Sequence, residues 1–162
     1  MAESRWLNEE EDRAWRGFQR MSMELAARLH RRLVNRTGLS LPDYEVLVVL
    51  SESCEDRMRP YELGEVLTWE KSRLSHHLSR MENRGLIERR VCPSDARGHF
   101  IALTEKGREA IEAAAPCHVD DVRQLLIDHM TPQEMATVAG LADKVLANLA
   151  EEPGQTPQEA PS

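Results

Sequence analysis

Hydrogen-bond donors and fixed positive charges collect on one side of a segment that begins near Lys71. The apolar residues Leu74, Leu78 and Met81 recur at the spacing of one helix face. The opposite side carries donors, two cations and no acid: Ser72, Arg73, His76, Ser79, Arg80 and Asn83. Hydroxyl, imidazole and guanidinium groups donate to phosphates and to the edges of bases, so this face has the chemistry for contacting duplex nucleic acid.

A further cation, Arg97, lies in a polar link between two apolar extended segments. The segments are predicted at 86–91 and 100–103, and the link Pro93-Ser94-Asp95-Ala96-Arg97-Gly98 is dense in turn-forming residues. A helix followed by such a hairpin is typical of a winged helix. In that fold the helix enters a major groove of DNA, and the cation at the wing tip reaches phosphates or the neighbouring minor groove.

The same central residues resemble a known family. Asp95-x-Arg97-Gly98 is followed by Leu103-Thr104-x-x-Gly107 and preceded by Arg84-Gly85-Leu86-Ile87-Glu88-Arg89, which is similar to the signature of MarR-type transcriptional regulators. The resemblance covers roughly 10–149, and its specific part is the central stretch. It implies a mainly α winged helix-turn-helix protein with a small β-hairpin wing, which dimerises through its N- and C-terminal helices.

The resemblance also implies which residues contact DNA. Arg97 matches the tip arginine of the family, and Ala96 stands where many members carry a second one. His77 is expected to flank the DNA backbone. The positions that match the groove-facing side of the family's recognition helix are Ser72, Arg73, Ser75, His76 and Arg80. The expected function is regulation of transcription, in the first place repression, by a homodimer on a pseudo-palindromic site in double-stranded DNA.

Charge is distributed unevenly along the chain. The 162-residue sequence has a formal net charge of −7, but Lys71–Arg108 holds nine Lys and Arg residues against four Asp and Glu residues. This segment therefore carries +5, and the remainder carries −12. A basic segment on an acidic scaffold can bind one polyanion while limiting non-specific contacts.

The neighbouring segments are predicted to be helices that position this module. A helix from about Glu10 to Arg36 has an apolar stripe and is too long to be buried within so small a domain. A buried helix opens at Pro42, and a short helix from Pro60 to Leu67 pairs with the polar-faced helix as the helix-turn-helix.

Local signals predict where several helices begin and end. Thr68 is expected to be the N-cap of the polar-faced helix, and Gly85 is expected to end it. Pro116 should kink or break the helix that follows the wing. Thr131-Pro132-Gln133-Glu134 has the pattern of a capping box and should start a last helix, which continues to about Ala150.

These elements divide the chain into four parts. The N-terminal dimerisation helix takes 1–40, and the winged helix-turn-helix DNA-binding lobe takes 41–108. The C-terminal dimerisation helices take 109–150. The last part, 151–162, is a polar, proline-rich tail that is expected to be disordered.

An effector site follows from the resemblance alone. In similar proteins a small, often aromatic acid binds between the dimer helices and the DNA-binding lobe. The matching region here would use Trp15, Phe18, His30 and Tyr44 to take a small aromatic or phenolic effector, although the same side chains would also serve as core. Such a ligand regulates only if it favours one separation of the two recognition helices over another.

Two other classes of function stay open at this point. Thiol-based redox sensing would use Cys54, Cys92 or Cys117, although the acidic neighbours of Cys54 disfavour its thiolate. A helical interaction module that does not bind DNA would keep the dimer helices but would not need Arg97. The sequence has no evident nucleophile with a base and no convergent metal site, so we expect neither an enzyme nor a metal or other cofactor.

Cysteine usage and hydropathy indicate a compartment. The three Cys residues lack metal-type spacing and cannot all pair within one chain, which fits a reducing cytosol. No early apolar run resembles a signal peptide, and the sequence contains no run of about 18 apolar residues. We therefore expect a cytoplasmic protein with no membrane partner.

Overall fold

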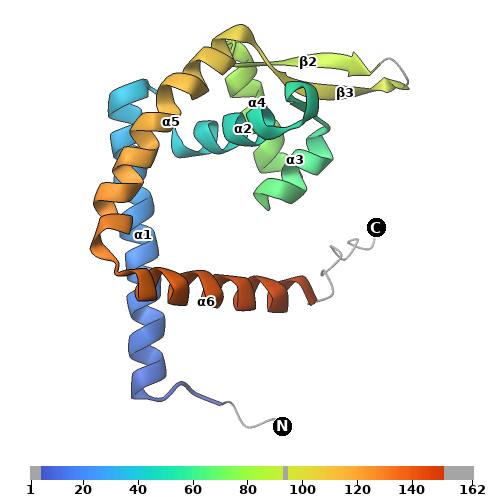
Figure 1. Cartoon of the computed structure of the whole chain (residues 1–162). Helices are drawn as coiled ribbons and strands as arrows, with labels where there is room; N and C mark the ends of the chain where they lie inside the picture. The colour runs from blue at the N-terminus through green and yellow to red at the C-terminus, as the bar shows by residue number, and fades with distance from the viewer. Residues whose placement is uncertain (1–4, 93–94, 152–162) are drawn as a thin grey trace. The chain divides into compact units, whose positions relative to one another are not determined.

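The computed structural model describes residues 5–92 and 95–151, without the side chains of residues 92 and 95–97. The chain forms two compact units, one up to Val122 and one from Arg123. The first unit contains, in chain order, α1 (Glu9–Thr37), α2 (Leu41–Glu52), η1 (Cys54–Asp56), β1 (Arg57–Met58), α3 (Pro60–Leu67), α4 (Lys71–Asn83), β2 (Ile87–Cys92), β3 (Asp95–Leu103) and most of α5 (Glu105–Leu125) (Figure 1). This arrangement confirms the predicted mainly α fold with a small β wing.

Helix α1 begins and ends at strong local signals. The side chain of Asn8 accepts from the backbone N–H of Glu11 at 2.9 Å, and the Glu11 carboxylate accepts from the N–H of Asn8 at 2.9 Å. This capping box satisfies two backbone donors at once. Gly38 ends the helix with a left-handed φ of 73°. Within the described part of the chain, Leu33 is the one buried residue that α1 contributes, so most of its predicted apolar stripe is exposed.

Helix α2 forms the centre of the core. Ser40 caps its first turn, and Pro42 lies inside that turn, as predicted. Val46, Leu47 and Leu50 are completely buried, and burial of each such side chain stabilises the fold by roughly 1.5–3 kcal/mol. The buried side chains that complete this core are Leu33, Leu39, Leu63, Leu74, Leu78, Met81, Leu86, Ile87, Ile101, Leu103, Ile111 and Ala114.

Helices α3 and α4 form the helix-turn-helix. Helix α3 has the predicted bounds, and Gly85 follows α4 with a φ of 72°. The prediction for Thr68 is wrong. Thr68 is the C-cap of α3, with a left-handed φ of 55°, and the N-cap of α4 is Glu70, which makes no side-chain capping bond. Because the turn between the helices is so short, Thr68 has to end one helix and cannot start the next.

The wing is part of a three-stranded antiparallel sheet with the order β1-β3-β2. Strands β2 and β3 confirm the predicted hairpin, in which Ile87 pairs with Leu103. Strand β1 was not predicted. Its two residues pair with the other edge of β3, with Arg57 opposite Ala102, and this pairing ties the base of the wing to the segment before α3.

Helix α5 packs closely against the base of the wing. Thr104 Oγ1 accepts from the N–H of Gly107 at 3.0 Å and donates to the carbonyl of Gly85 at 2.7 Å. The prediction for Pro116 was a kink or a break, and the break does not occur: α5 continues through Pro116 to Leu125. A proline removes one hydrogen bond, and buried contacts on both sides of it, at Ala114 and Asp121, keep the helix in place.

Ion pairs join α1 to α5. The Asp121 carboxylate is 1% exposed, accepts from Arg32 Nη1 at 2.8 Å and lies 3.3 Å from Arg36 Nη2. A buried carboxylate needs such partners, since a charge without them is costly to bury. The C-terminal half of α1 is therefore fixed to α5.

The second unit contains the end of α5, η2 (Ile127–His129) and α6 (Pro132–Glu151). The predicted capping box is confirmed: Thr131 Oγ1 accepts from the N–H of Glu134 at 3.3 Å, and the Glu134 carboxylate accepts from the N–H of Thr131 at 2.8 Å. Among the described residues of α6 none is buried. The tail predicted from Glu151 onward lies, beyond that first residue, outside the described residues.

Candidate nucleic-acid interface

The outer face of α4 carries the predicted polar residues. Leu74, Leu78 and Met81 are buried beneath it, as their spacing predicted. The exposed side chains on this helix include all five that matched groove-facing positions: Ser72, Arg73, Ser75, His76 and Arg80. The amphipathic pattern therefore places the donors of α4 on its solvent side.

Two of these cations have defined partners within the protein. The guanidinium of Arg73 lies over the ring of Trp69, 4.4 Å from its centroid. Arg80 Nη2 lies 3.0 Å from Nδ1 of His77. A stacked or hydrogen-bonded guanidinium samples fewer rotamers than a free one, so these two cations are partly oriented before any ligand binds.

The prediction that His77 flanks DNA is wrong. Its side chain is 8% exposed, and Nε2 lies 3.1 Å from Oδ1 of Asp43. The two atoms are close, but among the described residues Nε2 has no partner that meets hydrogen-bond geometry. The sequence held a signal for this burial, because Leu74, His77, Leu78 and Met81 together follow the i, i+3, i+4, i+7 spacing of one helix face.

Asp43, in the first turn of α2, collects several donors around a buried carboxylate. Its Oδ2 accepts from Arg84 Nη1 at 2.7 Å and from the backbone N–H of Ser40 at 2.8 Å. Arg84 also donates through Nη2 to the carbonyl of Gly38 at 3.1 Å. These partners make Arg84 a link between the end of α4 and the start of α2.

The electrostatics of this cluster favour an ionised Asp43. Burial by itself would raise the pKa of Asp43, but the contacts from His77, Arg84 and Ser40 outweigh burial and hold the pKa well below its usual range. Glu45, two residues further along the same helix, behaves differently. Burial raises the pKa of Glu45, and the charges of Arg73 and His77 offset only part of that rise.

The wing contributes further cations, most of them in ion pairs. On β2, Arg89 pairs with Glu82 at 2.8 Å and Arg90 pairs with Glu88 at 2.6 Å. The two pairs offset the positive charge of Arg89 and Arg90. The backbone of Arg97 lies in β3, but its side chain is outside the described residues. Its predicted role at the wing tip stays a prediction.

The four residues predicted to line an effector site cannot line one pocket within one chain. Trp15 and Phe18 are about half exposed on α1 and stack with ring centroids 6.3 Å apart. His30 lies about 22 Å from Trp15 along the same helix, at about 1.5 Å per residue, and its Nδ1 accepts from the N–H of Leu41 at 3.2 Å. Tyr44 packs instead against the ring of His118, with centroids 4.4 Å apart.

His118 is a polar group that sequence reasoning did not single out. Its Nδ1 is buried without a hydrogen-bond partner among the described residues. Burial lowers the pKa of His118, and the nearby Asp121 charge opposes part of that shift. The imidazole is therefore held in its neutral form more strongly than an exposed histidine would be.

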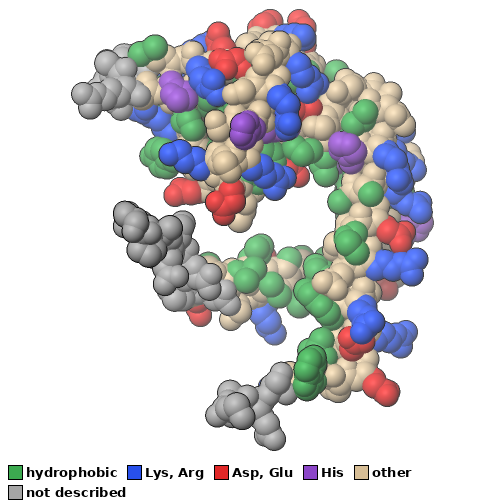
Figure 2. All heavy atoms as spheres, turned by 180° about the vertical axis from the view of Figure 1, so that it is seen from behind, with side chains coloured by type: hydrophobic (Ala, Val, Ile, Leu, Met, Phe, Trp, Pro, Cys, Tyr) green, Lys and Arg blue, Asp and Glu red, His purple; other side chains and the backbone are tan. Residues whose placement is uncertain are grey.

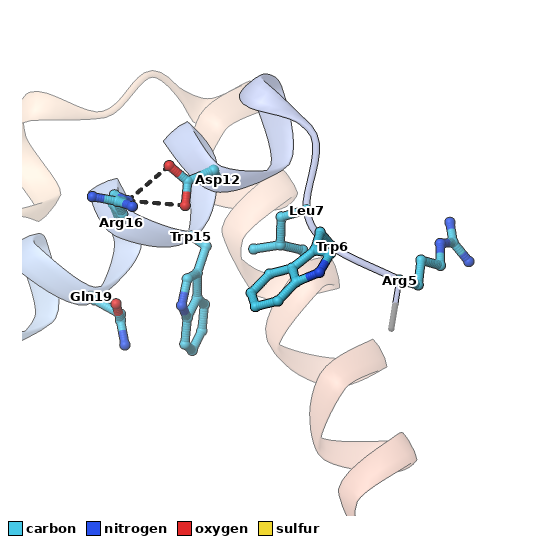
Figure 3. A pocket seen from close by; sticks show the side chains of 7 residues that line it. All are labelled: Arg5, Trp6, Leu7, Asp12, Trp15, Arg16 and Gln19. Atoms are coloured by element: carbon cyan, nitrogen blue, oxygen red, sulfur yellow. Dashed lines mark hydrogen bonds and ion pairs between the residues drawn. The ribbon is translucent and has the colours of Figure 1, made fainter. Parts of the chain in front are cut away.

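A hollow at the N-terminal end of α1 is open to solvent. Its lining residues are Arg5, Trp6, Leu7, Asp12, Trp15, Arg16 and Gln19. Figure 3 shows Trp6 and Leu7 close together beside Trp15, with Arg16 held by Asp12 on the helix. Hydrophobic side chains are visible on the open surface at this end of the chain (Figure 2).

Other site types have little support in the structure. Among the side chains that the structure describes, no group of three or more His, Cys, Asp or Glu residues is placed to hold a metal ion. Cys54 is exposed on η1, Cys117 is partly buried, and the Cys92 side chain lies outside the described residues. No helix in the described ranges combines the length and the apolar composition that crossing a bilayer would need.

Comparisons with known proteins agree with the geometry of α4 and the wing. Residues 28–114 match the family model described as transcriptional regulator SarA/Rot. The multiple antibiotic resistance protein MarR of Escherichia coli is 32% identical over 117 residues, which cover 71% of this chain and 81% of that protein.

Solved structures give similar results over nearly the whole chain. AbsC, a MarR family transcriptional regulator from Streptomyces coelicolor, is 39% identical with a TM-score of 0.86, and the match covers 92% of this chain and 100% of that one. Sco3205, a MarR family transcriptional regulator from the same organism solved in complex with DNA, is 36% identical with a TM-score of 0.87, over 97% and 98% of the two chains.

Proposed function

The chain belongs to the MarR family of winged helix-turn-helix transcriptional regulators, and we propose that it binds a pseudo-palindromic operator as a homodimer and represses transcription. It is a DNA-binding regulator and not an enzyme. The observation that carries the proposal is the exposed face of α4, where five donor side chains lie over a buried apolar stripe. In the proposed mechanism this face enters a major groove and Arg97 reaches the adjacent backbone or minor groove.

Sequence preference is proposed to come from α4, and most of the non-specific affinity from cations that meet phosphates. Arg73 is the best candidate for a base contact, because a guanidinium can donate two parallel hydrogen bonds to a guanine edge. Its stacking on Trp69 holds the side chain at the surface of α4. Ser72, Ser75, His76 and Arg80 are proposed to make the remaining base and phosphate contacts.

Homodimerisation is supported by apolar side chains that one chain leaves open. On α1, Trp15, Phe18 and Met21 are each at least 50% exposed. On α6, the exposed large hydrophobic residues are Val138, Leu141, Val145, Leu146 and Leu149. Exposed apolar patches of this kind mark association surfaces on soluble proteins. A second copy of the chain would cover them and would place two α4 helices for the two half-sites, about one helical turn of DNA apart.

Regulation is proposed to follow from a change in the spacing of the two α4 helices. A small aromatic or phenolic effector that binds one spacing better than the other would release the operator. Of the residues predicted for the effector site, His30 accepts from the backbone of α2 and Tyr44 packs on His118 of α5, and we propose this part of the lobe as the one a ligand would contact. We also propose the cytoplasm as the compartment, since the target is DNA.

A selection experiment tests the proposed function. Purified protein would be used to select duplexes from a library with a randomised central region, and the selected sequence would then be compared with a scrambled duplex in gel-shift assays. We expect a selected sequence with two-fold symmetry, one dimer bound per duplex, and affinity that falls steeply with salt. A reporter gene placed behind the selected sequence should be repressed. Equal affinity for selected and scrambled duplexes would refute the proposal.

Redox sensing through Cys54 is the second candidate, and the exposure of its thiol is the observation that favours it. Oxidation requires access, and an exposed thiol has it. The test compares affinity for the selected duplex before and after peroxide, with Cys54→Ser as the control variant. Equal affinities before and after treatment would end this candidate.

A further inference from the structure

His77 lies between a buried carboxylate and an exposed guanidinium. Its Nε2 is 3.1 Å from Oδ1 of Asp43 on α2, and its Nδ1 is 3.0 Å from Nη2 of Arg80 on the outer side of α4. One imidazole ring therefore connects the core of the protein to a side chain on the face that is proposed to meet DNA.

The chemistry of the two partners decides which ring nitrogen carries the proton. A guanidinium has donors and no acceptor, so Nδ1 of His77 must accept from Arg80 and carries no hydrogen. An ionised carboxylate is acceptor-only, so Nε2 must present its hydrogen to Asp43. Both neighbours match one species, the neutral ring that is protonated on Nε2 and accepts on Nδ1.

The ring has little freedom to leave this arrangement. The ring of Trp69 meets it edge to face, with centroids 5.3 Å apart. Asp43 is itself fixed by Arg84 and by the backbone of Ser40. The charged groups that act on His77 are Asp43 and Glu45 from α2, with Arg80 from α4. The position of Nδ1 is therefore set by the core and not by solvent.

We propose that His77 is a positioning residue, which holds the Arg80 guanidinium in one direction on the DNA-facing side of α4. The proposal rests on the proposed docking of α4 in DNA. A free arginine would have to be ordered when DNA binds, which weakens affinity by roughly twofold to tenfold for each immobilised side chain. The His77 acceptor orders Arg80 in advance, and its effect on DNA binding therefore passes through Arg80.

A double-mutant cycle tests this dependence. The probe is the duplex selected by the wild-type protein, with a scrambled duplex as reference. His77→Phe keeps an aromatic ring but removes both ring nitrogens. Arg80→Met keeps the aliphatic part of the side chain but removes the guanidinium. The third variant combines the two substitutions. We expect Arg80→Met to weaken binding to the selected duplex by roughly tenfold. His77→Phe should weaken it by roughly threefold to tenfold, and the double variant should bind like Arg80→Met alone.

A purely structural role for His77 would give a different result. In that case His77→Phe would weaken DNA binding by the same factor whether residue 80 is Arg or Met. The affinity of the double variant would then be reduced by the product of the two single-variant factors. That result, or wild-type affinity in either single variant, overturns the proposal. A matched cycle of His77→Phe with Lys71→Met, an exposed cation in the first turn of the same helix, should show multiplying factors. His77→Gln, whose amide can both donate and accept, should retain most of the affinity.

A spectroscopic measurement on the wild-type protein does not depend on how the variants fold. The ¹⁵N chemical shifts of the His77 ring at pH 7.5 report which nitrogen is protonated. We expect a protonated Nε2 and an unprotonated Nδ1, and a proton on Nδ1 would overturn the proposal. A wild-type protein that does not distinguish selected from scrambled duplex would instead refute the proposed function itself, and the proposal for His77 with it.

Discussion

Arg84 donates to Asp43 at 2.7 Å, which joins the C-terminal end of the recognition helix α4 to the first turn of α2. The carboxylate is 2% exposed, and its four close contacts come from Arg84, His77 and the backbone and side chain of Ser40. The orientation of α4 is thus set by a buried charge as well as by apolar packing.

Replacement of Asp43 by Asn should therefore destabilise the protein in a pH-dependent way. We expect a loss of about 2–3 kcal/mol at pH 7.5, the usual contribution of hydrogen bonds to a charged group. The folded-state pKa of Asp43 lies below its unfolded value. The unfolded state therefore takes up the proton first, so the advantage of the wild type is complete above about pH 4 and is lost as the pH falls further.

Urea unfolding at pH 7.5, 4 and 3 measures this effect. The difference in stability between wild type and Asp43→Asn should shrink with acid, and a constant difference would contradict the assignment. Glu24→Gln is the matched control, because Glu24 forms an exposed pair with Arg20 and its removal should leave stability nearly unchanged at each pH.

Arg73 and Arg97 should differ in their effects on DNA binding. Arg73→Ala should weaken binding to the selected duplex by about 1–3 kcal/mol and relax the preference at one base position. Arg97→Ala should weaken binding to selected and scrambled duplexes alike and should reduce the slope of log affinity against log salt by about one. Gel shifts at several salt concentrations measure the affinities and the salt slopes. If both variants lost the same affinity for the selected duplex and the same affinity for the scrambled duplex, the two arginines would not have different roles.

His118 should make stability fall in mild acid. Its folded-state pKa is lowered by burial, so the unfolded state binds the proton first as the pH drops through about 6.5. Stability is therefore greatest above that pH and decreases below it. His118→Gln cannot titrate and should lose less stability than the wild type between pH 7.5 and 5.5. Equal losses in the two proteins, measured by urea unfolding, would show that His118 does not contribute.

Gly107 should not tolerate a side chain. A Cβ atom added there would lie 2.0 Å from the carbonyl oxygen of Leu86, which is backbone and cannot move aside. Gly107→Ala should therefore cost about 3 kcal/mol or prevent folding. Glu109→Ala, on an exposed position of the same helix, should stay within about 0.5 kcal/mol of the wild type. Thermal unfolding compares the two, and a wild-type midpoint for Gly107→Ala would contradict the close approach of α5 to the wing.

The apolar surface of α1 should be needed for association. Phe18→Glu places a charge on a face where Trp15 and Phe18 stack in the open, and it should shift the protein from dimer toward monomer. Analytical ultracentrifugation over a range of protein concentrations measures the shift. Glu24→Gln again serves as the control, and an unchanged dimer in Phe18→Glu would exclude this part of α1 from the interface.

Periodic features of the fold were predictable from the sequence. The stripe Leu74, Leu78 and Met81 predicted the buried side of α4, and Pro60 and Leu67 bounded α3 correctly. These predictions succeed because burial repeats along a helix at a fixed spacing. The hairpin was predictable for a similar reason, since apolar segments flanked a link of turn-forming residues.

Features that depend on distant partners were not predictable. Asp43, His77 and Arg84 come together only in the folded chain. Neither their residue types nor their separation in the sequence predicts that contact. Strand β1 has two residues, too few for any periodicity. The four residues assigned to an effector site have separate contacts within one chain, and family likeness does not show which side chains a second chain would add.

Strand β1 also has a mechanical consequence. Met58 is paired with the wing strand β3, and only Arg59 separates it from Pro60 at the start of α3. A displacement of the wing would therefore displace α3 as well, because the linking segment is too short to absorb the movement. We expect the wing and the helix pair to move as a single rigid lever, so that a poorly shaped binding site is accommodated by bending of the duplex.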